Sequence, residues 1–366
     1  MSEDPSYTSK LDRRVSVAPM MERTDRHFRC LLRLLAPRTL LYTEMVTAAA
    51  IMRGDSARLL RYDPAEHPVA LQLGGSDPDV LVAAARMGAE HGYDEINLNI
   101  GCPSERVQSG RFGVCLMREP ALVAECVAAM RAAVNVPVTV KTRIGVDHDD
   151  EFAFLARFVE TVTAAGCRTF VVHARKAWLH GVSPKANRTL PPLDYERVAA
   201  LKRAFPSLEI IVNGGLTTIA QVRAQLERVD GVMIGREAWR QPWLMAELDR
   251  LVYGGASTPL SREEAAQGYL THVARELEEG ARLSHLLRPL SGLYHAEPGA
   301  AQWRRELGTI GTAAGCRSHT KGGSGTRANA PVDALARAIA AIAVSQGSLG
   351  GAGGKRPKSV SAATAM

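Results

Sequence analysis

One cysteine, on a loop that follows a buried strand, is the residue best placed for chemistry in this sequence. Residues 96–100 alternate between aliphatic side chains and asparagines, which predicts a strand, and Gly101 ends it just before Cys102. A free thiol has a pKa of about 8.5, so at neutral pH it carries a proton that it can donate. The alternative is a small buried hydrophobic residue, because free cysteines often lie in protein cores.

Further polar residues and glycines stand where other predicted strands end. They are Pro19-Met20-Met21, Gln72, Lys141, His173, Asn213-Gly214-Gly215 and Gly235-Arg236. Each alone is explained by a turn, an ion pair or a buried polar residue. Together, the late glycines and Arg236 can hold a phosphate, while the amide, amine and imidazole groups can donate hydrogen bonds to an electron-rich ring. This combination predicts a phosphorylated, planar cofactor, and flavin mononucleotide (FMN) fits it.

Eight short apolar stretches between residues 14 and 236 alternate with amphipathic helical stretches. The predicted strands are 14–19, 40–45, 68–73, 96–100, 136–141, 169–173, 209–213 and 231–234. Strands that are apolar on both faces indicate a parallel sheet covered by helices, and their count predicts a (β/α)8 TIM barrel with its active site at the strands' C-terminal ends. A doubly wound sheet is disfavoured, because no glycine-rich phosphate loop follows the first strand.

After the predicted barrel, the sequence pattern changes from alternating strands and helices to helices alone. We expect residues 1–257 to form the FMN-binding catalytic barrel and residues 258–345 to form a small helical domain, with helices at 261–287, 300–307 and 332–344. Residues 311–330 are rich in glycine and serine and are expected to be loose, and 346–366 are expected to be a disordered tail.

The composition is that of a globular protein and narrows its class. The chain has 366 residues, 46% hydrophobic and 23% charged, and a net charge of +7 that fits a polyanionic partner without requiring one. No stretch is long and apolar enough to span a membrane, and no apolar signal region follows the polar start, so we expect a cytoplasmic protein. The six cysteines show neither C-x-x-C nor zinc spacing, which predicts free thiols and no metal.

Several motifs together carry a specific resemblance. They are Ala18-Pro-Met-Met, Gln72-Leu-Gly-Gly, Asn97-Leu-Asn-Ile-Gly-Cys102-Pro-Ser, Gly110-Arg-Phe-Gly-Val-Cys115-Leu-Met, Val140-Lys-Thr-Arg-Ile-Gly, Val172-His-Ala-Arg and Val212-Asn-Gly-Gly. The chain thereby resembles the tRNA-dihydrouridine synthases over about residues 13–305. The loop from His173 to Arg188 resembles the A subfamily.

This resemblance implies an oxidoreductase that acts on a CH–CH bond, the 5,6 double bond of uridine at positions 20 and 20a of the tRNA D-loop. NADPH, or NADH, would reduce FMN, N5 of the flavin would pass hydride to C6, and Cys102 would protonate C5. The target base would leave its stack, as in other enzymes that act on bases. The partner would be a folded tRNA gripped at its D-loop and elbow, and the enzyme would be monomeric and independent of membranes and metals.

The resemblance also assigns roles to residues. Pro19, Met20, Met21, Gln72, Lys141 and His173 would contact the flavin, and Asn213, Gly214, Gly215, Gly235 and Arg236 would hold its ribityl phosphate. Asn99 would touch the flipped uridine, and Lys185, Arg188 and Arg304 would contact tRNA. Cys115, in a more apolar setting, is the weaker candidate for the acid.

One departure from the resemblance matters. The family often reads Gly-Ala-Arg-x-Trp-Arg-Arg in its helical domain, whereas this chain has Ala301 at the position of the first arginine. One tRNA contact is therefore in doubt, while Arg304 remains. Two other classes stay open: a flavin barrel that acts on a free pyrimidine, and a non-catalytic protein that binds tRNA.

Overall fold

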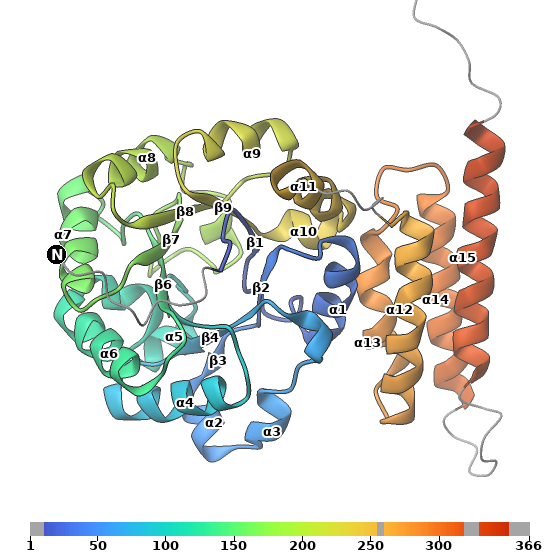
Figure 1. Ribbon diagram of the computed structural model, residues 1–366, viewed down its shortest axis with the longest axis horizontal. Helices are drawn as coiled ribbons and strands as arrows, with labels where there is room; N and C mark the ends of the chain where they lie inside the picture. The colour runs from blue at the N-terminus through green and yellow to red at the C-terminus, as the bar shows by residue number, and fades with distance from the viewer. Residues whose placement is uncertain (1–10, 255–259, 318–328, 351–366) are drawn as a thin grey trace, which may run out of the picture. The chain divides into compact units, whose positions relative to one another are not determined.

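The chain divides into two compact units, residues 1–260 and 261–366. The computed structural model describes residues 11–254, 260–317 and 329–350 (Figure 1). We describe each unit by itself.

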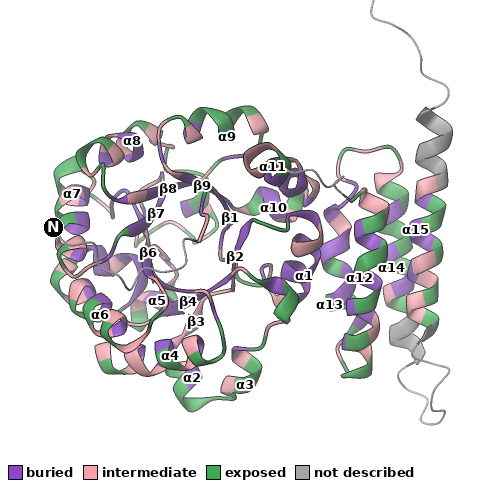
Figure 2. Ribbon diagram, viewed as in Figure 1, coloured by how far each residue is buried: buried purple, intermediate pink, exposed green. Residues whose placement is uncertain are grey.

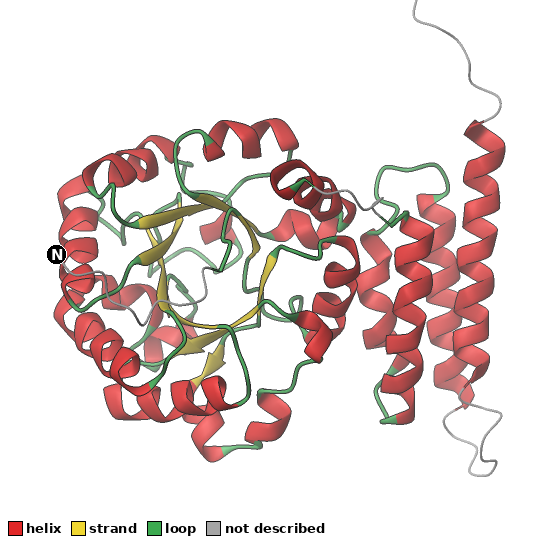
Figure 3. Cartoon of the chain, in the orientation of Figure 1, coloured by secondary structure: helices red, strands yellow, loops and turns green. Residues whose placement is uncertain are grey.

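The first unit contains a closed barrel of parallel strands (Figure 3). The eight barrel strands are β1 (Val15–Val17), β2 (Leu40–Tyr42), β4 (Val69–Gly74), β5 (Glu95–Ile100), β6 (Val138–Arg143), β7 (Thr169–His173), β8 (Glu209–Asn213) and β9 (Gly231–Ile234). Each pairs with its neighbour in parallel, β1 with β9, and the pairing of β2 with β4 closes the ring. The predicted TIM barrel is confirmed.

The strand predicted at 40–45 is interrupted. Leu41 pairs with Val69, but in the short β3 (Val46–Thr47), Val46 pairs with Leu73, so one extra residue lies on the β2–β3 side. This is the signature of a β-bulge, which bends a strand locally. β3 is thus the continuation of β2 along the same neighbour.

Helices surround the strands on the outside of the barrel (Figure 1). The longer ones are α1 (Arg26–Leu35), α2 (Ala48–Arg53), α4 (Pro78–Glu90), α6 (Pro120–Ala133), α7 (Phe152–Ala164), α8 (Tyr195–Ala204), α9 (Ile219–Leu226) and α11 (Trp243–Tyr253). The shorter ones are α3 (Ser56–Leu59), α5 (Glu105–Ser109), α10 (Arg236–Arg240) and the 3-10 turns η1 (Pro64–Glu66), η2 (Gly113–Arg118) and η3 (Ala186–Arg188).

Local sequence explains where several of these helices begin. Asp25 accepts a hydrogen bond from the backbone of Phe28 and caps α1, and Asp77 caps α4, which has Pro78 in its first turn. An acceptor side chain before a helix satisfies backbone N–H groups that have no partner within the helix. Both helices therefore begin directly after their capping residue.

The strands are buried on both faces (Figure 2). Apolar residues between strands and helices form the main core, and a smaller cluster fills the barrel interior. The interior cluster consists of Ala18, Leu40, Tyr42, Ala70, Val171, Ile211 and Met233. Side chains alternate between the two faces along a strand, so the buried polar residues Glu95, Asn97 and Asn99 share one face of β5.

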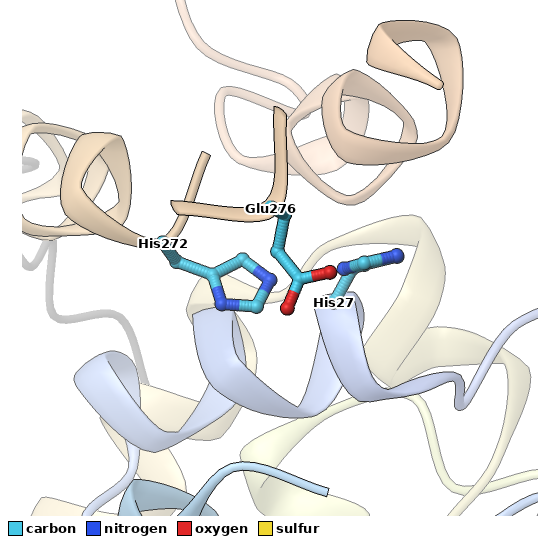
Figure 4. Close-up of side chains that lie close together, drawn as sticks. All are labelled: His27, His272 and Glu276. Carbon is cyan, nitrogen blue, oxygen red and sulfur yellow. The ribbon is translucent and has the colours of Figure 1, made fainter. Parts of the chain in front are cut away.

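The second unit is helical, as predicted, with elements α12 (Arg262–Glu278), α13 (Leu283–Leu287), η4 (Arg288–Gly292), α14 (Ala300–Arg317) and α15 (Asn329–Gly350). Its buried Trp303 donates a hydrogen bond from Nε1 to the Leu290 carbonyl at 2.8 Å and packs edge-on against Tyr294. In α12, His272 and Glu276 lie one turn apart (Figure 4); the third side chain labelled there, His27, belongs to α1 of the first unit.

Three predictions about the second unit are wrong in extent. The helix expected at 261–287 is broken after Glu278, where Gly280 has a left-handed φ of 85°. α14 continues to Arg317, through part of the segment expected to be loose, and α15 continues to Gly350, into the expected tail. Residues 318–328 and 351–366 lie outside the described residues. No helix of the described residues is long and apolar enough to cross a membrane.

Candidate active site

The loop that carries Cys102 is held through its backbone on both sides. Asn99 Oδ1 accepts hydrogen bonds from the backbone N–H groups of Gly101 and Cys102, both at 3.0 Å. The Cys102 carbonyl accepts from the N–H of Val114 at 3.1 Å. The thiol itself is half-buried and lies 3.5 Å from the Ser104 hydroxyl. The backbone is therefore fixed while the sulfur keeps only a weak partner.

Gly113 makes this arrangement possible from the other side. Its φ is 78°, and a Cβ there would lie 2.6 Å from the Cys102 carbonyl oxygen and 2.4 Å from a Val107 methyl carbon. Only glycine adopts this conformation at no steric cost and leaves room for the carbonyl. The Gly110–Met117 motif therefore serves to pack η2 against the cysteine loop.

Cys115 has a different environment. Its Sγ lies 3.1 Å from the Phe112 carbonyl, so its proton is engaged within its own turn. Burial raises the pKa of the Cys115 thiol, and Glu119 raises it further. A thiol with a raised pKa is a weaker acid, which agrees with the lower rank that the sequence assigned to it.

A group of cationic side chains surrounds the Cys102 sulfur. The Cys102 charge would raise the pKa values of Lys141, Arg143 and Arg188, which places the sulfur near all three. Among the described residues, no carboxylate contributes to these shifts. Burial, followed by the charge of Arg143, lowers the pKa of Lys141 to about 7. A concentration of positive charge without a counter-ion is a site built for an anion.

His173 stands among the same cations. Burial, and then the charges of Arg143, Lys141, Arg175 and Arg236, lower its pKa well below the ordinary value. The imidazole is therefore neutral at physiological pH, so only one of its ring nitrogens carries a proton to donate. It acts here as a single hydrogen-bond donor and adds no charge.

The glycine turn after β8 packs closely against this imidazole. Gly214 has a φ of 114°, and a Cβ there would lie 2.6 Å from His173 Cδ2. Gly215 has a φ of 67°, and its Cβ would lie 2.4 Å from Leu193. Asn213 anchors the turn, since its Oδ1 accepts from Lys141 Nζ at 3.1 Å and its Nδ2 donates to the Met233 carbonyl at 2.8 Å. Lys141 and His173, which were predicted to contact the ring, therefore lie next to Asn213 and Gly214, which were predicted to hold the phosphate.

Three buried amide side chains form a second hydrogen-bonded group in the barrel. Asn99 Nδ2 donates to Gln72 Oε1, and Gln72 Nε2 donates to Asn97 Oδ1, both at 2.8 Å. Asn97 Nδ2 donates in turn to Thr139 Oγ1 at 2.8 Å. Gln72 is 1% exposed and Asn99 9% exposed, so these amides have fixed orientations.

The basic loop, residues 174–193, is anchored by one buried amide. Asn187 is fully buried; its Nδ2 donates to the carbonyls of Trp178 and Val182, and its Oδ1 accepts from the Trp178 N–H. Lys185 and Arg188 flank it in sequence and are exposed. Arg236 donates from Nη2 to the Arg188 carbonyl at 3.0 Å, which brings it beside this loop.

Arg143, a polar residue that the sequence placed at the end of its strand, and Gln108, which the sequence did not single out, connect the basic loop with the cysteine loop. Arg143 donates to the Gly101 carbonyl and to the carbonyls of Lys176 and Asn187, at 2.8 to 3.1 Å. Gln108 Nε2 donates to the carbonyls of Pro103 (2.9 Å) and Leu179 (3.0 Å). The carbonyls that Arg143 and Gln108 reach on the basic loop lie far from these donors in sequence. Residue spacing therefore could not predict these contacts.

The remaining predicted site residues differ in their exposure and in the element that carries them. Pro19 and Met20 follow β1 and are half-buried, Met20 against the barrel interior cluster, whereas Met21 is 60% exposed. Gly235 immediately precedes α10, and Arg236 opens it. Arg304 is exposed on α14 of the second unit, as is Ala301, the position where the resemblance expected an arginine. Within the barrel unit, hydrogen bonds connect Gln72 with Asn99 and Lys141 with Asn213, whereas Arg304 belongs to the second unit.

Comparisons with known proteins show the family to which this chain belongs. Residues 16–321 match the model of the family described as dihydrouridine synthase (Dus). A protein of Shewanella oneidensis named tRNA-dihydrouridine(20/20a) synthase is 52% identical over 300 residues, which cover 82% of this chain and 89% of that one. A Synechocystis protein of the same name is 56% identical over 293 residues, covering 80% and 88%.

A further protein of this name, from Escherichia coli K12, is 52% identical over 295 residues, which cover 80% of this chain and 85% of that one. Among solved structures, one named morphinone reductase aligns with 67% of this chain and 87% of its own, at 15% identity and a TM-score of 0.49.

Proposed function

Because this chain belongs to the dihydrouridine synthase family, we propose that it is a flavin-dependent enzyme that reduces uridine to dihydrouridine at positions 20 and 20a of the tRNA D-loop. The observation that carries the proposal is the geometry at Cys102. The Cys102 thiol stands on a fixed backbone, near the basic side chains of Lys141 and Arg188. No carboxylate among the described residues raises the pKa of either side chain. We propose a catalytic barrel at 1–257 and a tRNA-binding helical region at 258–345.

The residues at the C-terminal ends of the barrel strands fit FMN. Lys141, the neutral His173 and the buried Gln72 supply donors for the ring, and Pro19, Met20 and Met21 supply apolar surface. The glycine turn at Gly214-Gly215, with Asn213, Gly235 and Arg236, supplies backbone and guanidinium donors for the phosphate. Held by these residues, FMN would supply the hydride for C6 of the uracil, with NADPH or NADH as the source of electrons.

Cys102 completes the reduction by giving its proton to C5 of the base. General acid catalysis requires a proton within hydrogen-bonding reach of the acceptor, and holding the donor in place removes the entropic cost of finding that geometry. Asn99 and Val114 hold the Cys102 backbone, so the side chain starts from a fixed position. Proton donation leaves a thiolate, which Lys141, Arg143 and Arg188 stabilise electrostatically.

The exposed cations provide tRNA binding. Lys185 and Arg188 extend from the basic loop into solvent, and Arg304 extends from α14. Such side chains contact phosphates and release counter-ions, so affinity falls as salt rises. The tRNA bound this way delivers its flipped uridine to Asn99 and Cys102.

The experiment that tests this function is mass spectrometry of tRNA from cells with and without the gene. The expected result is a gain of two hydrogens at positions 20 and 20a, lost in the deletion and restored by the wild-type gene. Purified protein should also show the yellow absorbance of a flavin. Reduction of free uridine, with none of unmodified tRNA, would instead indicate an enzyme of free pyrimidines.

A further inference from the structure

A buried carboxylate lies below the active site, and the mechanism above does not use it. Glu95 is fully buried on β5 and accepts three hydrogen bonds. Arg13 donates to Oε2 at 2.7 Å, while the Tyr42 and Thr139 hydroxyls donate to Oε1 at 2.6 and 2.5 Å. In this ion pair with Arg13, both carboxylate oxygens of Glu95 accept hydrogen bonds and donate none.

This carboxylate is the lower end of a continuous chain that reaches the cysteine loop. Thr139 gives its only hydroxyl proton to Glu95, so its oxygen must accept from Asn97 Nδ2. Asn97 then presents its oxygen to Gln72 Nε2, and Gln72 presents its oxygen to Asn99 Nδ2. Every bond in the chain therefore runs in the same direction, towards Glu95.

The upper end of the chain demands the same direction independently. The backbone N–H groups of Gly101 and Cys102 can only donate, so Asn99 Oδ1 must face them and its Nδ2 must face Gln72. Hydrogen bonds that point one way along a chain strengthen one another in a medium of low dielectric constant. A reversal at any link would leave two like groups facing each other.

We infer that Glu95 and Thr139 are positioning residues that fix, through this one-way chain, the amides of Gln72 and Asn99 and thereby the loop that carries Cys102. Neither residue touches the substrate. This inference rests on the proposed function, because its effect is read out in the reduction of tRNA.

Thr139→Val is the sharpest test, because it removes the connecting hydroxyl while it keeps side-chain shape and leaves the buried Arg13–Glu95 pair intact. We expect the single-turnover rate of tRNA reduction by pre-reduced enzyme to fall about tenfold, since small misplacements of reacting groups are costly. The rate of flavin reduction by NADPH and the Kd for tRNA should change less than twofold. Thr139→Ser, which keeps the hydroxyl, should restore the rate.

Thr142→Val provides the matched control. Thr142 lies on the same strand and is equally buried, but an odd step along the strand separates it from Thr139, so it faces the outside of the barrel. Its hydroxyl has only long contacts, at 3.5 and 3.4 Å, with the Ile100 and Arg143 carbonyls. This variant should keep the wild-type rate.

The outcomes separate the inference from the function on which it rests. If wild-type protein does not reduce tRNA, the proposed function fails. If wild type is active and Thr139→Val reduces tRNA equally fast, the function stands and the inference is wrong. An equal slowing of Thr139→Ser, or of Thr142→Val, would also overturn it, because it would indicate a general packing effect.

Discussion

The cysteine loop after β5 and the basic loop after β7 are stabilised in opposite ways. In the first, Asn99 and Val114 hold the backbone on either side of the reactive residue itself. In the second, the buried Asn187 is the anchor, and its neighbours Lys185 and Arg188 are left exposed. A proton donor needs one geometry, whereas cations that contact phosphates can act from several. This difference is the one we expect if the first loop carries the reacting residue and the second binds tRNA, as proposed.

Loss of the thiol should have the largest effect. Cys102→Ala removes the proposed proton donor, so we expect kcat for dihydrouridine formation to fall about 10²- to 10⁴-fold, the usual contribution of a general acid. The measurement is single-turnover formation of dihydrouridine by pre-reduced enzyme, followed by mass spectrometry.

Cys115→Ala is the control for this variant, because its thiol bonds to the Phe112 carbonyl and has a raised pKa. It should retain activity within about twofold. If Cys115→Ala proves inactive and Cys102→Ala active, the contrast between the two cysteines is wrong.

Loss of the basic-loop anchor should affect binding and leave chemistry unchanged. Asn187→Ala leaves the Trp178 N–H and several carbonyls without their side-chain partner, at a cost of about 1–3 kcal/mol for a buried group. We expect KM for tRNA to rise about tenfold or more, with little change in flavin reduction by NADPH.

Lys185→Gln gives the comparison for the anchor, since it removes one exposed charge that is not assigned to the thiolate and keeps the loop. It should weaken tRNA binding only a few-fold and reduce the slope of log affinity against log salt by about one. An anchor variant that binds tRNA as wild type does would show that the loop needs no anchoring.

The pKa of Lys141 predicts how flavin binding depends on pH. Since this pKa is about 7, the amine of the flavin-free protein is neutral above that pH. A flavin that accepts a hydrogen bond from the ammonium raises the pKa, so binding above pH 7 takes up a proton. The Kd for FMN should be constant below pH 7 and rise above it, by up to about tenfold per pH unit.

Fluorescence titration of flavin-free protein from pH 6 to 9 measures this dependence, in a Cys102→Ala background because the charge of Cys102 acts on Lys141. Lys141→Met should abolish the slope. The flavin-free protein should also gain stability, relative to Lys141→Met, as pH rises from about 7, because the lysine of the unfolded chain has the ordinary pKa of 10.5 and still holds its proton there. A slope that persists in Lys141→Met would assign the titration to another group.

The link between the two loops should have the smallest effect. Gln108→Met keeps the length of the side chain but removes the donor shared by Pro103 and Leu179. We expect kcat/KM for tRNA to fall about fivefold, close to the value of one hydrogen bond. Gln221→Met, which disrupts the capping box of α9, is the control for a general loss of stability. Equal effects of the two variants would mean that the loops act independently.

The sequence predicted the barrel because its signals are local. Strand ends such as His173 and Asn213 were placed correctly, and caps such as Asp25 and Asp77 marked helix starts. Gly280 was also a local sign of a helix end, because glycine commonly ends helices. The prediction of a single helix over 261–287 did not take it into account.

The roles of Arg143, Gln108 and Asn187 could not be predicted in this way. Arg143 bonds to carbonyls 33 and 44 residues away, and Gln108 to one 71 residues away. Backbone carbonyls are present at every residue, so no side-chain pattern reveals which of them a donor will meet. The extra length of α14 was missed because Gly311 indicated a loop, whereas its packing against α15 overrides that weak preference.

If Asn99 contacts the base, as proposed, its orientation has a consequence for which base is accepted. Its oxygen is fully used by two backbone N–H groups, and one amide hydrogen is used by Gln72, so a single N–H is left to offer. That hydrogen matches a carbonyl, which uracil has at C4, and opposes the exocyclic amine that cytosine has there. Polarity at one side chain would thus exclude cytidine from the same position of a tRNA, without any steric barrier.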